Sequence, residues 1–390
     1  MSLRFMRIKG ASHPFPGQRR EGWRNLAKPT RSCFDSDMQA PAKIGLIGYG
    51  VAGSAFHAPL IASTPGLALA AVVTRDDERA AAVVARYPEA VVVTEVEQLW
   101  SLGLDAVTIA TPNSTHAALA GEALSRGISV VVDKPLAVSL PEGEEVVARA
   151  LDSDALLTVF FNRRWDSDFL TLVELLGGGS LGRVARFESR FERWRPQVAA
   201  TWKETAGAGE GGGILHDLGP HVIDQALLLF GPVARVYAEV DRTRPGATNP
   251  DDVFIALTHT SGVRSHLFMS AAAADLGPRF RVLGTSGGYR IFGLDGQEDA
   301  LRAGRRPDTE VGGWGAEPES RTGILSGSAA PEPIPTLPGD YPAFYREWSL
   351  ALHGQGPVPV DPADAIAGLR IIEAAQRSSD TGAVVPVEGS

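Results

Sequence analysis

The chain has 390 residues, which is more than one ordinary domain and fits two or three. Its composition, 44% hydrophobic and 21% charged with 43 glycines and 27 prolines, excludes a collagen-like, coiled-coil or wholly disordered protein. The net charge of −9 disfavours nonspecific nucleic-acid binding, and no apolar run reaches the ~20 residues of a membrane span. The single cysteine, Cys33, excludes a disulfide framework or a thiolate zinc site within one chain, which favours a reduced, cytoplasmic setting.

The N-terminal segment differs from the rest of the chain in charge. Residues 1–37 carry eight basic and three acidic side chains, a net charge of +5, which leaves −14 on the remainder. This segment has no continuous apolar stretch of the kind found in secretory signals. We expect residues 1–40 to be a disordered extension, with Met38 as an alternative start.

The first ordered element is expected to be a buried strand over Lys43–Ile47. It leads into a G-x-G-x-x-G motif at the start of a helix, the pattern of a dinucleotide-binding turn. The first glycine permits the tight turn, the second lets a pyrophosphate approach the backbone, and the third lets helix and strand pack closely. A ligand-free βα turn is the alternative. The predicted cofactor contacts here are Gly48, Tyr49, Gly50, Val51, Ala52 and Gly53.

The end of the second strand bears on the choice of cofactor. Leu69–Val73 is followed by Thr74 and Arg75, at the distance from the glycines where the ribose 2′ position is usually recognised. An arginine accommodates a 2′-phosphate, so Thr74 and Arg75 favour NADP. NAD stays possible because Asp76 follows directly, and Arg75 has the alternative of a solvated loop residue.

Strands and helices continue to alternate up to residue 161, as in repeated βαβ units of a parallel sheet. We expect strands over Asp105–Ala110, Ile128–Val132 and Leu156–Phe161, with helices over Ser114–Arg126 and after the capping box of Ser139 and Glu142. Ligands bind at the carboxyl ends of such strands. Thr111, Pro112, Asn113 and Lys134 fall at these ends.

The pattern changes after residue 161, which divides the chain into domains at 41–161 and 162–390. Short strand candidates with few helices between them predict a largely antiparallel sheet, over 183–194, 234–240, 253–260, 263–270, 280–284 and 289–292. Helices are expected over Asp217–Phe230, Pro342–Leu352 and Pro362–Arg377. The segment 304–338 has little periodic apolar content and is expected to be a long loop or a mobile segment.

Asp217 and His221 are spaced i and i+4, so they share one helical face near the helix start. The alternative is that Asp217 caps the helix and His221 has a structural role. For His216 and His259 we expect a structural role. The glycine run 211–213 permits close approach of a ligand or of another backbone, and it favours a functional role for Asp217 and His221.

Three motifs in order make the chain from Lys43 to Arg377 similar to the glucose-fructose oxidoreductase / inositol dehydrogenase (Gfo/Idh/MocA) family. They are the glycines of 48–53, Asp133-Lys134-Pro135, which resembles the family's Glu-Lys-Pro, and Gly212-x-x-x-x-Asp217-x-Gly219-x-His221. Asp133 for glutamate is a conservative departure. Residues 162–169 and 293–299 further resemble the bacterial branch of NADP-dependent scyllo-inositol dehydrogenases.

The resemblance implies an α/β fold: an N-terminal Rossmann domain with a parallel sheet, then a C-terminal α/β domain with a large open, mainly antiparallel sheet. It implies catalytic roles for Lys134, Asp217 and His221. It also implies a homodimer or homotetramer. The further residues expected to complete the cofactor site are Thr111, Pro112, Asn113, His116, Asp133 and Lys134.

The residue types suit oxidation of a secondary alcohol, which requires loss of a hydride and a proton. His221 is the expected base because the ordinary histidine pKa of ~6.5 lies near working pH. Asp217 would orient it or bind substrate, and Lys134 would stabilise the alkoxide; Lys134 as the base is the alternative. No metal is required. Substrate contacts are expected from Asn162, Arg164, Asp166, Trp194 and Trp202, each with a core or loop role as the alternative.

The leading functional prediction is an NADP-preferring oxidoreductase that acts on a secondary alcohol or ketone of an inositol or sugar-like polyol. One alternative is an enzyme of the same fold for a dihydrodiol or an imine. The other is a dinucleotide-binding sensor without turnover, which would have no need of acid–base groups at the crevice. Neither nucleic acid nor membrane is an expected partner.

Overall fold

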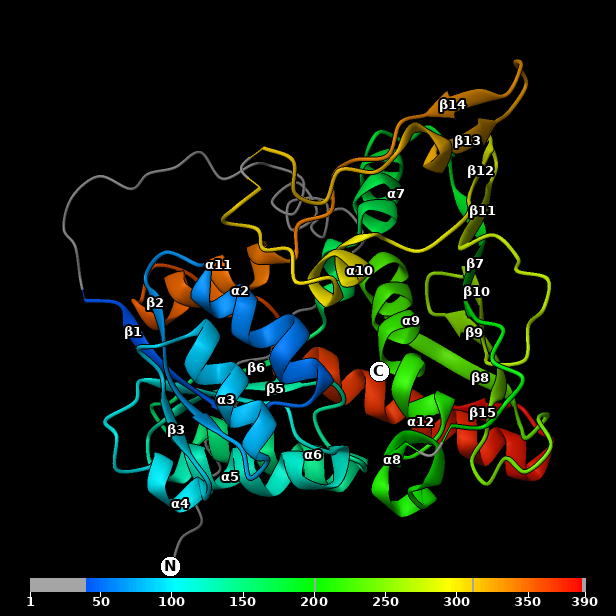
Figure 1. The fold of residues 1–390 in the computed structure, drawn as a ribbon. Coiled ribbons are helices and arrows are strands. Elements are labelled where there is room, and N and C mark those ends of the chain that lie inside the picture. The colour runs from blue at the N-terminus through cyan, green and yellow to red at the C-terminus, as the bar shows by residue number, and fades with distance from the viewer. Residues whose placement is uncertain (1–39, 200, 311, 388–390) are drawn as a thin grey trace, which may run out of the picture.

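The computed structural model describes residues 40–199, 201–310 and 312–387, and for residues 202, 203 and 208 only the backbone. The expected disordered extension, with Cys33 and Met38, lies outside the described residues. Figure 1 shows a blue-to-cyan α/β half beside a half built on a second, larger sheet. No helix among the described residues is long and apolar enough to cross a membrane.

The N-terminal half contains a six-stranded parallel sheet in the order β3-β2-β1-β4-β5-β6, which confirms the predicted Rossmann sheet. The order changes direction between β1 and β4, and this switch point is where doubly wound sheets bind ligands. The strands are β1 (Ala42–Ile47), β2 (Leu67–Val73), β3 (Val91–Val93), β4 (Ala106–Ile109), β5 (Ser129–Asp133) and β6 (Leu157–Phe160).

Helices cover both faces of this sheet (Figure 1). The helical segment after the glycine motif begins as a π-helix and continues as an α-helix. Asp76 caps α3, in which Val83 is the buried residue. Because so few of its apolar residues are buried, α3 was not predicted from the sequence. The elements are η1 (Ala52–His57), α2 (Ala58–Ala62), α3 (Asp77–Arg86), α4 (Val96–Leu99), η2 (Asn113–Thr115), α5 (His116–Ser125) and α6 (Leu140–Leu151).

A helix from far along the chain completes the first core. Helix α11 (Pro342–Leu352) contributes Phe344, Tyr345 and Trp348, all fully buried, to the hydrophobic cluster of the Rossmann sheet. The Phe160 and Phe344 rings meet edge to face at a centroid distance of 4.8 Å. The N-terminal core therefore depends on residues beyond position 340 for its completion.

The second half contains a nine-stranded sheet in the order β14-β13-β12-β11-β7-β10-β9-β8-β15. Strands β7 and β10 pair in parallel and their other neighbours pair antiparallel, so the mainly antiparallel prediction is confirmed. The strands are β7 (Val184–Glu192), β8 (Val233–Asp241), β9 (Asp252–His259), β10 (Arg264–Ser270), β11 (Phe280–Gly284), β12 (Gly288–Ile291), β13 (Gly323–Ser326), β14 (Glu332–Ile334) and β15 (Val385–Pro386).

Helices α9 and α12 cover one face of the nine-stranded sheet (Figure 1). Along β9, Val253, Ile255 and Leu257 point into this core, whereas Phe254 lies on the opposite face. The helical elements are η3 (Asn162–Trp165), α7 (Ser167–Gly177), α8 (Trp202–Thr205), η4 (Ala208–Glu210), α9 (Ile214–Phe230), α10 (Gln297–Arg302), η5 (Glu319–Arg321) and α12 (Pro362–Thr381).

The prediction of one long loop over residues 304–338 is wrong in part. The segment contains η5 and the paired strands β13 and β14, which extend the sheet beyond β12. These strands are only four and three residues long, and Ile324, Leu325 and Ile334 are only partly buried. So short and half-exposed a pattern carries no clear periodicity, and pairing with β12 determines its conformation.

Candidate functional site

The glycine turn between β1 and η1 has the geometry of a pyrophosphate cradle. Gly48 has φ 96°, and a Cβ there would come 2.7 Å from the carbonyl oxygen of Ala110. A Cβ on Gly53 would come 2.1 Å from the Gly48 oxygen, so this position requires close packing. Gly50 faces open space with no atom within 4 Å of a Cβ. The three positions therefore match the turn, packing and ligand-approach roles of a dinucleotide motif.

The three residues after β2 differ in their freedom to meet a ribose. Thr74 is buried, and its amide donates to the Val93 oxygen at 3.0 Å. Asp76 accepts from the Arg79 amide at 2.9 Å and caps α3. The Arg75 side chain is 76% exposed, with its guanidinium 2.5 Å from Glu95. Of the three, Arg75 is the residue able to turn toward a 2′-phosphate.

The loops after β4 and β5 are tied together by His116. The ring nitrogens lie 2.7 Å from the Pro135 oxygen and 2.9 Å from the Thr111 oxygen. Burial lowers the pKa of this histidine. His116 thus holds the strand ends in place from inside the protein. Asn113 extends the edge further, donating to the Gly211 oxygen at 3.0 Å and so joining the loop after β4 to the glycine run before α9.

Lys134 and Asp217 form the contact that joins the end of β5 to the start of α9. The Lys134 ammonium donates to the Asp217 carbonyl oxygen at 2.6 Å and to its carboxylate at 3.0 Å. The side chains are 12% and 23% exposed. A part-buried cation paired with a carboxylate therefore lies at the carboxyl edge of the Rossmann sheet, where chemistry on a bound dinucleotide would occur.

His221 follows Asp217 by one helical turn on the same face of α9. The residue is only 7% exposed, and its ring stacks against Phe191 at a centroid distance of 6.4 Å. The glycine run before α9 serves another backbone: a Cβ on Gly212 would come 2.3 Å from the Ala206 oxygen, and Gly213 has φ 87°. The run therefore sets where α9 begins and, with it, the positions of Asp217 and His221.

Behind Lys134, His57 lies close to Asp133, a contact that the sequence did not predict. His57 is fully buried, with Nδ1 2.7 Å from the Tyr345 hydroxyl and Nε2 3.9 Å from Asp133. Although burial alone raises the pKa of Asp133, His57 and Lys134 hold it below its usual value. Asp133 also accepts from the Lys134 amide at 2.9 Å. No spacing in the sequence links residues 57, 133 and 345; only folding brings them together.

Two of the expected substrate contacts lie in the protein interior. Arg164 donates to Asp224 at 2.5 and 2.8 Å and to Asp364 at 2.8 Å. Asp166 is fully buried and accepts from the Tyr341 hydroxyl at 2.7 Å, and burial raises its pKa to about 8. These hydrogen bonds to other buried side chains favour the alternative interpretation, in which Arg164 and Asp166 are core residues.

The other three expected substrate contacts differ in exposure. Asn162 is buried, 5% exposed, at the start of η3. Trp194 is 56% exposed and pairs its backbone with Ala272. The side chain of Trp202 lies outside the described residues. None of these positions by itself identifies a substrate.

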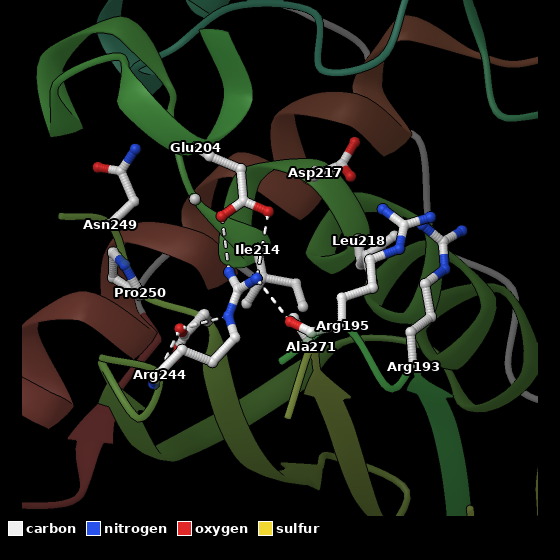
Figure 2. A pocket seen from close by; sticks show the side chains of 12 residues that line it. Arg193, Arg195, Glu204, Ile214, Asp217, Leu218, Arg244, Asn249, Pro250 and Ala271 are labelled. Carbon is white, nitrogen blue, oxygen red and sulfur yellow. Dashed lines mark hydrogen bonds and ion pairs between the residues drawn. The ribbon is translucent and has the colours of Figure 1, made fainter. Parts of the chain in front are cut away.

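A hollow beside Asp217 contains arginines that the sequence analysis did not assign to the substrate (Figure 2). Arg244 is held there by Glu204 at 2.6 Å and Asp251 at 2.8 Å. Arg193 and Arg195 reach into the same hollow from the chain after β7. Arg193 and Arg244 had no signal in the sequence, because isolated arginines are ordinary surface residues until the fold places them together.

The doubly wound sheet, the glycine cradle and the lysine at the crevice define a dinucleotide-binding oxidoreductase fold. Two family models match the chain: "Oxidoreductase family, NAD-binding Rossmann fold" over residues 42–161 and "Oxidoreductase family, C-terminal alpha/beta domain" over residues 173–388. The chain therefore belongs to the Gfo/Idh/MocA oxidoreductase family.

Similar proteins span nearly the same length. "Uncharacterized oxidoreductase YdgJ" of Escherichia coli (strain K12) is 43% identical over 85% of this chain and 94% of the relative. "scyllo-inositol 2-dehydrogenase (NADP(+)) IolW" of Bacillus subtilis (strain 168) is 34% identical over 89% of this chain and 96% of the relative. The structure of the YPO2259 putative oxidoreductase from Yersinia pestis is 42% identical, with a TM-score of 0.84, 90% of this chain covered and 99% of the other.

The buried Arg164 pair generates a stability prediction. Asp224→Ala leaves the Arg164 cation buried with Asp364 as its remaining carboxylate, and should lower the free energy of unfolding by about 3–5 kcal/mol. Urea denaturation followed by fluorescence measures the loss. Glu145→Ala, which removes an exposed partner of Arg149, is the control and should cost less than about 1 kcal/mol. Equal losses in the two variants would contradict the assigned core role.

Proposed function

We propose that the protein is an NADP-preferring dehydrogenase that acts on a secondary alcohol, or in reverse a ketone, of an inositol or sugar-like polyol. The observation that carries the proposal is the Lys134–Asp217 contact at the carboxyl end of β5, with His221 one turn along α9. The Bacillus subtilis relative is named as an NADP(+)-dependent scyllo-inositol 2-dehydrogenase, and this likeness supports the proposed substrate class and cofactor.

Each of the three side chains has a distinct role in the proposed reaction. The cofactor supplies the hydride acceptor when it is bound. Lys134 binds the reacting oxygen and stabilises its developing negative charge, an effect that is strong in a site with little water. His221 takes the hydroxyl proton during oxidation and returns it during reduction. Asp217 holds the Lys134 ammonium through two oxygens and so orients it toward the crevice.

The carboxylate beside Lys134 bears on which residue is the base. A negative charge 3.0 Å from the Lys134 nitrogen stabilises the charged ammonium. A lysine kept charged is suited to stabilise an alkoxide and poorly suited to accept a proton. This favours His221 as the base over Lys134.

Replacement of either group tests the mechanism. Lys134→Ala and His221→Ala should each lower turnover by about 10²-fold or more, while NADP(H) binding changes little. Turnover is followed at 340 nm with both cofactors against inositol isomers, aldoses and their ketones or lactones. Lys43→Ala, an exposed lysine on β1, is the control and should keep full activity.

Two results would contradict this proposal. Unchanged turnover in both variants would exclude the assigned roles. Tight cofactor binding by the wild type, with no turnover of any polyol, dihydrodiol or imine, would favour the dinucleotide sensor instead.

The cofactor preference rests on the exposed guanidinium of Arg75. To bind a 2′-phosphate, Arg75 must break its ion pair with Glu95 and form one with the phosphate, which carries more negative charge. Hydrogen bonds between guanidinium and phosphate are strong enough to favour this change of partner. Arg75→Ala should weaken NADPH binding about tenfold and leave NADH binding unchanged, as measured by fluorescence titration. Arg126→Ala, which replaces an exposed arginine directly after α5, is the control. An equal loss for both cofactors would count against the 2′-phosphate contact.

We also propose that the chain forms a homo-oligomer through the face of the nine-stranded sheet opposite α9 and α12. Phe254 and Phe268 lie on this face with their rings 5.0 Å apart, and the Arg190 guanidinium lies over Phe268 at 4.2 Å. In the described part of the chain no helix covers them (Figure 1). A partly exposed aromatic patch of this kind is typical of a subunit interface.

A charge placed in this patch should dissociate the oligomer, because an unpaired carboxylate is costly to bury. Phe268→Glu should lower the mass measured by light scattering after size exclusion. Leu151→Glu, at an 82% exposed apolar position on α6, should leave the mass unchanged. A wild-type monomer, or an unchanged mass for Phe268→Glu, would contradict this interface.

A further inference from the structure

We propose that Arg193 and Arg195 form an anion-binding subsite beside Lys134 and Asp217, so that the substrate carries a carboxylate or a phosphate group. The inference rests on the proposed function for the position of the reacting carbon. It narrows the substrate class from polyols in general to their acidic derivatives, such as sugar acids or sugar phosphates.

The backbone fixes both arginines on one side of the chain. After β7, the Arg193 amide donates to the Ser270 oxygen and the Arg195 amide to the Ala271 oxygen, each at 2.8 Å. These bonds, with the bridge between Trp194 and Ala272, continue the extended conformation of β7. Alternate side chains of an extended segment point the same way, so Arg193 and Arg195 enter the hollow together and Trp194 points away.

Figure 2 shows the two guanidiniums directed to the same side as Asp217, whereas Arg244 points to the other part of the hollow. Asp217 lies both in the lining of the hollow with the two arginines and in contact with Lys134. A substrate with its reacting oxygen at Lys134 can extend a second group into the hollow.

The charges in the hollow are unevenly compensated. Arg244 has two carboxylate partners, Glu204 and Asp251. Among the described residues, by contrast, neither Arg193 nor Arg195 forms an ion pair. What Arg193 does contact is the Phe191 ring, 4.9 Å from its guanidinium.

Two carboxylates that act electrostatically on Arg193, Glu298 and Asp217, are already engaged by other cations. Glu298 binds Arg163 at 2.6 Å, and Asp217 binds Lys134. Partial burial lowers the pKa of Arg193, and the like charge of Arg195 lowers it further. Arg195 itself is exposed. Among the described residues neither guanidinium has a carboxylate of its own, so an anion bound by both would offset the repulsion between their like charges.

The chemistry of guanidinium selects the kind of anion. Its planar fork donates two parallel hydrogen bonds, which match a carboxylate or a phosphate and add geometric selectivity to the charge. A neutral inositol would leave both cations uncompensated. An acidic sugar or a phosphate ester would satisfy them and, at the same time, hold its carbon skeleton in a single orientation in front of Lys134.

Anion binding can be tested without turnover. Isothermal titration of the protein–NADP⁺ complex with inorganic phosphate keeps the nucleotide phosphate site filled, so added phosphate reports on the second site. We expect saturable binding that weakens about tenfold or more in Arg193→Gln and in Arg195→Gln. Arg193→Lys should retain part of the affinity because it keeps the charge. Arg126→Gln, a remote exposed arginine, is the matched control and should bind as the wild type does.

Steady-state kinetics then separates this proposal from the general one. Arg193→Gln should raise KM about tenfold for a sugar acid or sugar phosphate, with kcat and the KM of the neutral parent sugar little changed. Lost phosphate binding in the glutamine variants of a protein that turns over no substrate would support the subsite while the proposed activity fails. Unchanged phosphate affinity in both variants, or wild-type preference for the neutral sugar, would overturn the subsite.

Discussion

The ion pair of Lys134 with Asp217 is the contact on which the organisation of the crevice depends. Lys134 follows β5 of the parallel sheet in the first half and Asp217 lies in the long helix of the second, so their ion pair is one of the contacts that link the two. Both partners are positioned from behind: Asp133 binds the Lys134 amide, and Gly213 sets the first turn of α9. A small error in either element would separate a cation from its carboxylate at the edge where the cofactor is expected.

The crevice carries a cluster of positive side chains, although the molecule as a whole is negatively charged. The chain has a net charge of −9, yet Lys134 pairs with Asp217, and Arg193 and Arg195 line the hollow beside that carboxylate. A local cluster of cations on an acidic protein attracts small anions at short range while the overall charge repels polyanions such as nucleic acid. This distribution favours a small, acidic substrate.

Much of the fold was predictable because its periodic patterns are strong. The buried strands of the Rossmann sheet, the strands β7 to β12 of the second sheet and the ends of α11 follow from apolar runs and from glycine or proline at the boundaries. Elements with weak patterns were missed: α3 buries little, and β13 and β14 are short edge strands that form by pairing. Arg164 was predicted to contact substrate, and the structure surrounds it with two carboxylates instead.

The sequence by itself determined the local chemistry: a glycine turn able to admit a pyrophosphate, a lysine after a buried strand, and an aspartate and a histidine on one helical face. These features depend on residue type and on spacing over a few positions, and both can be read directly from the sequence. Only the tertiary structure decided which distant groups meet, including His57 with Asp133 and the two arginines of the hollow with Asp217. Such meetings are set by strand order and helix packing, which bring together residues up to hundreds of positions apart, and no short-range signal encodes them.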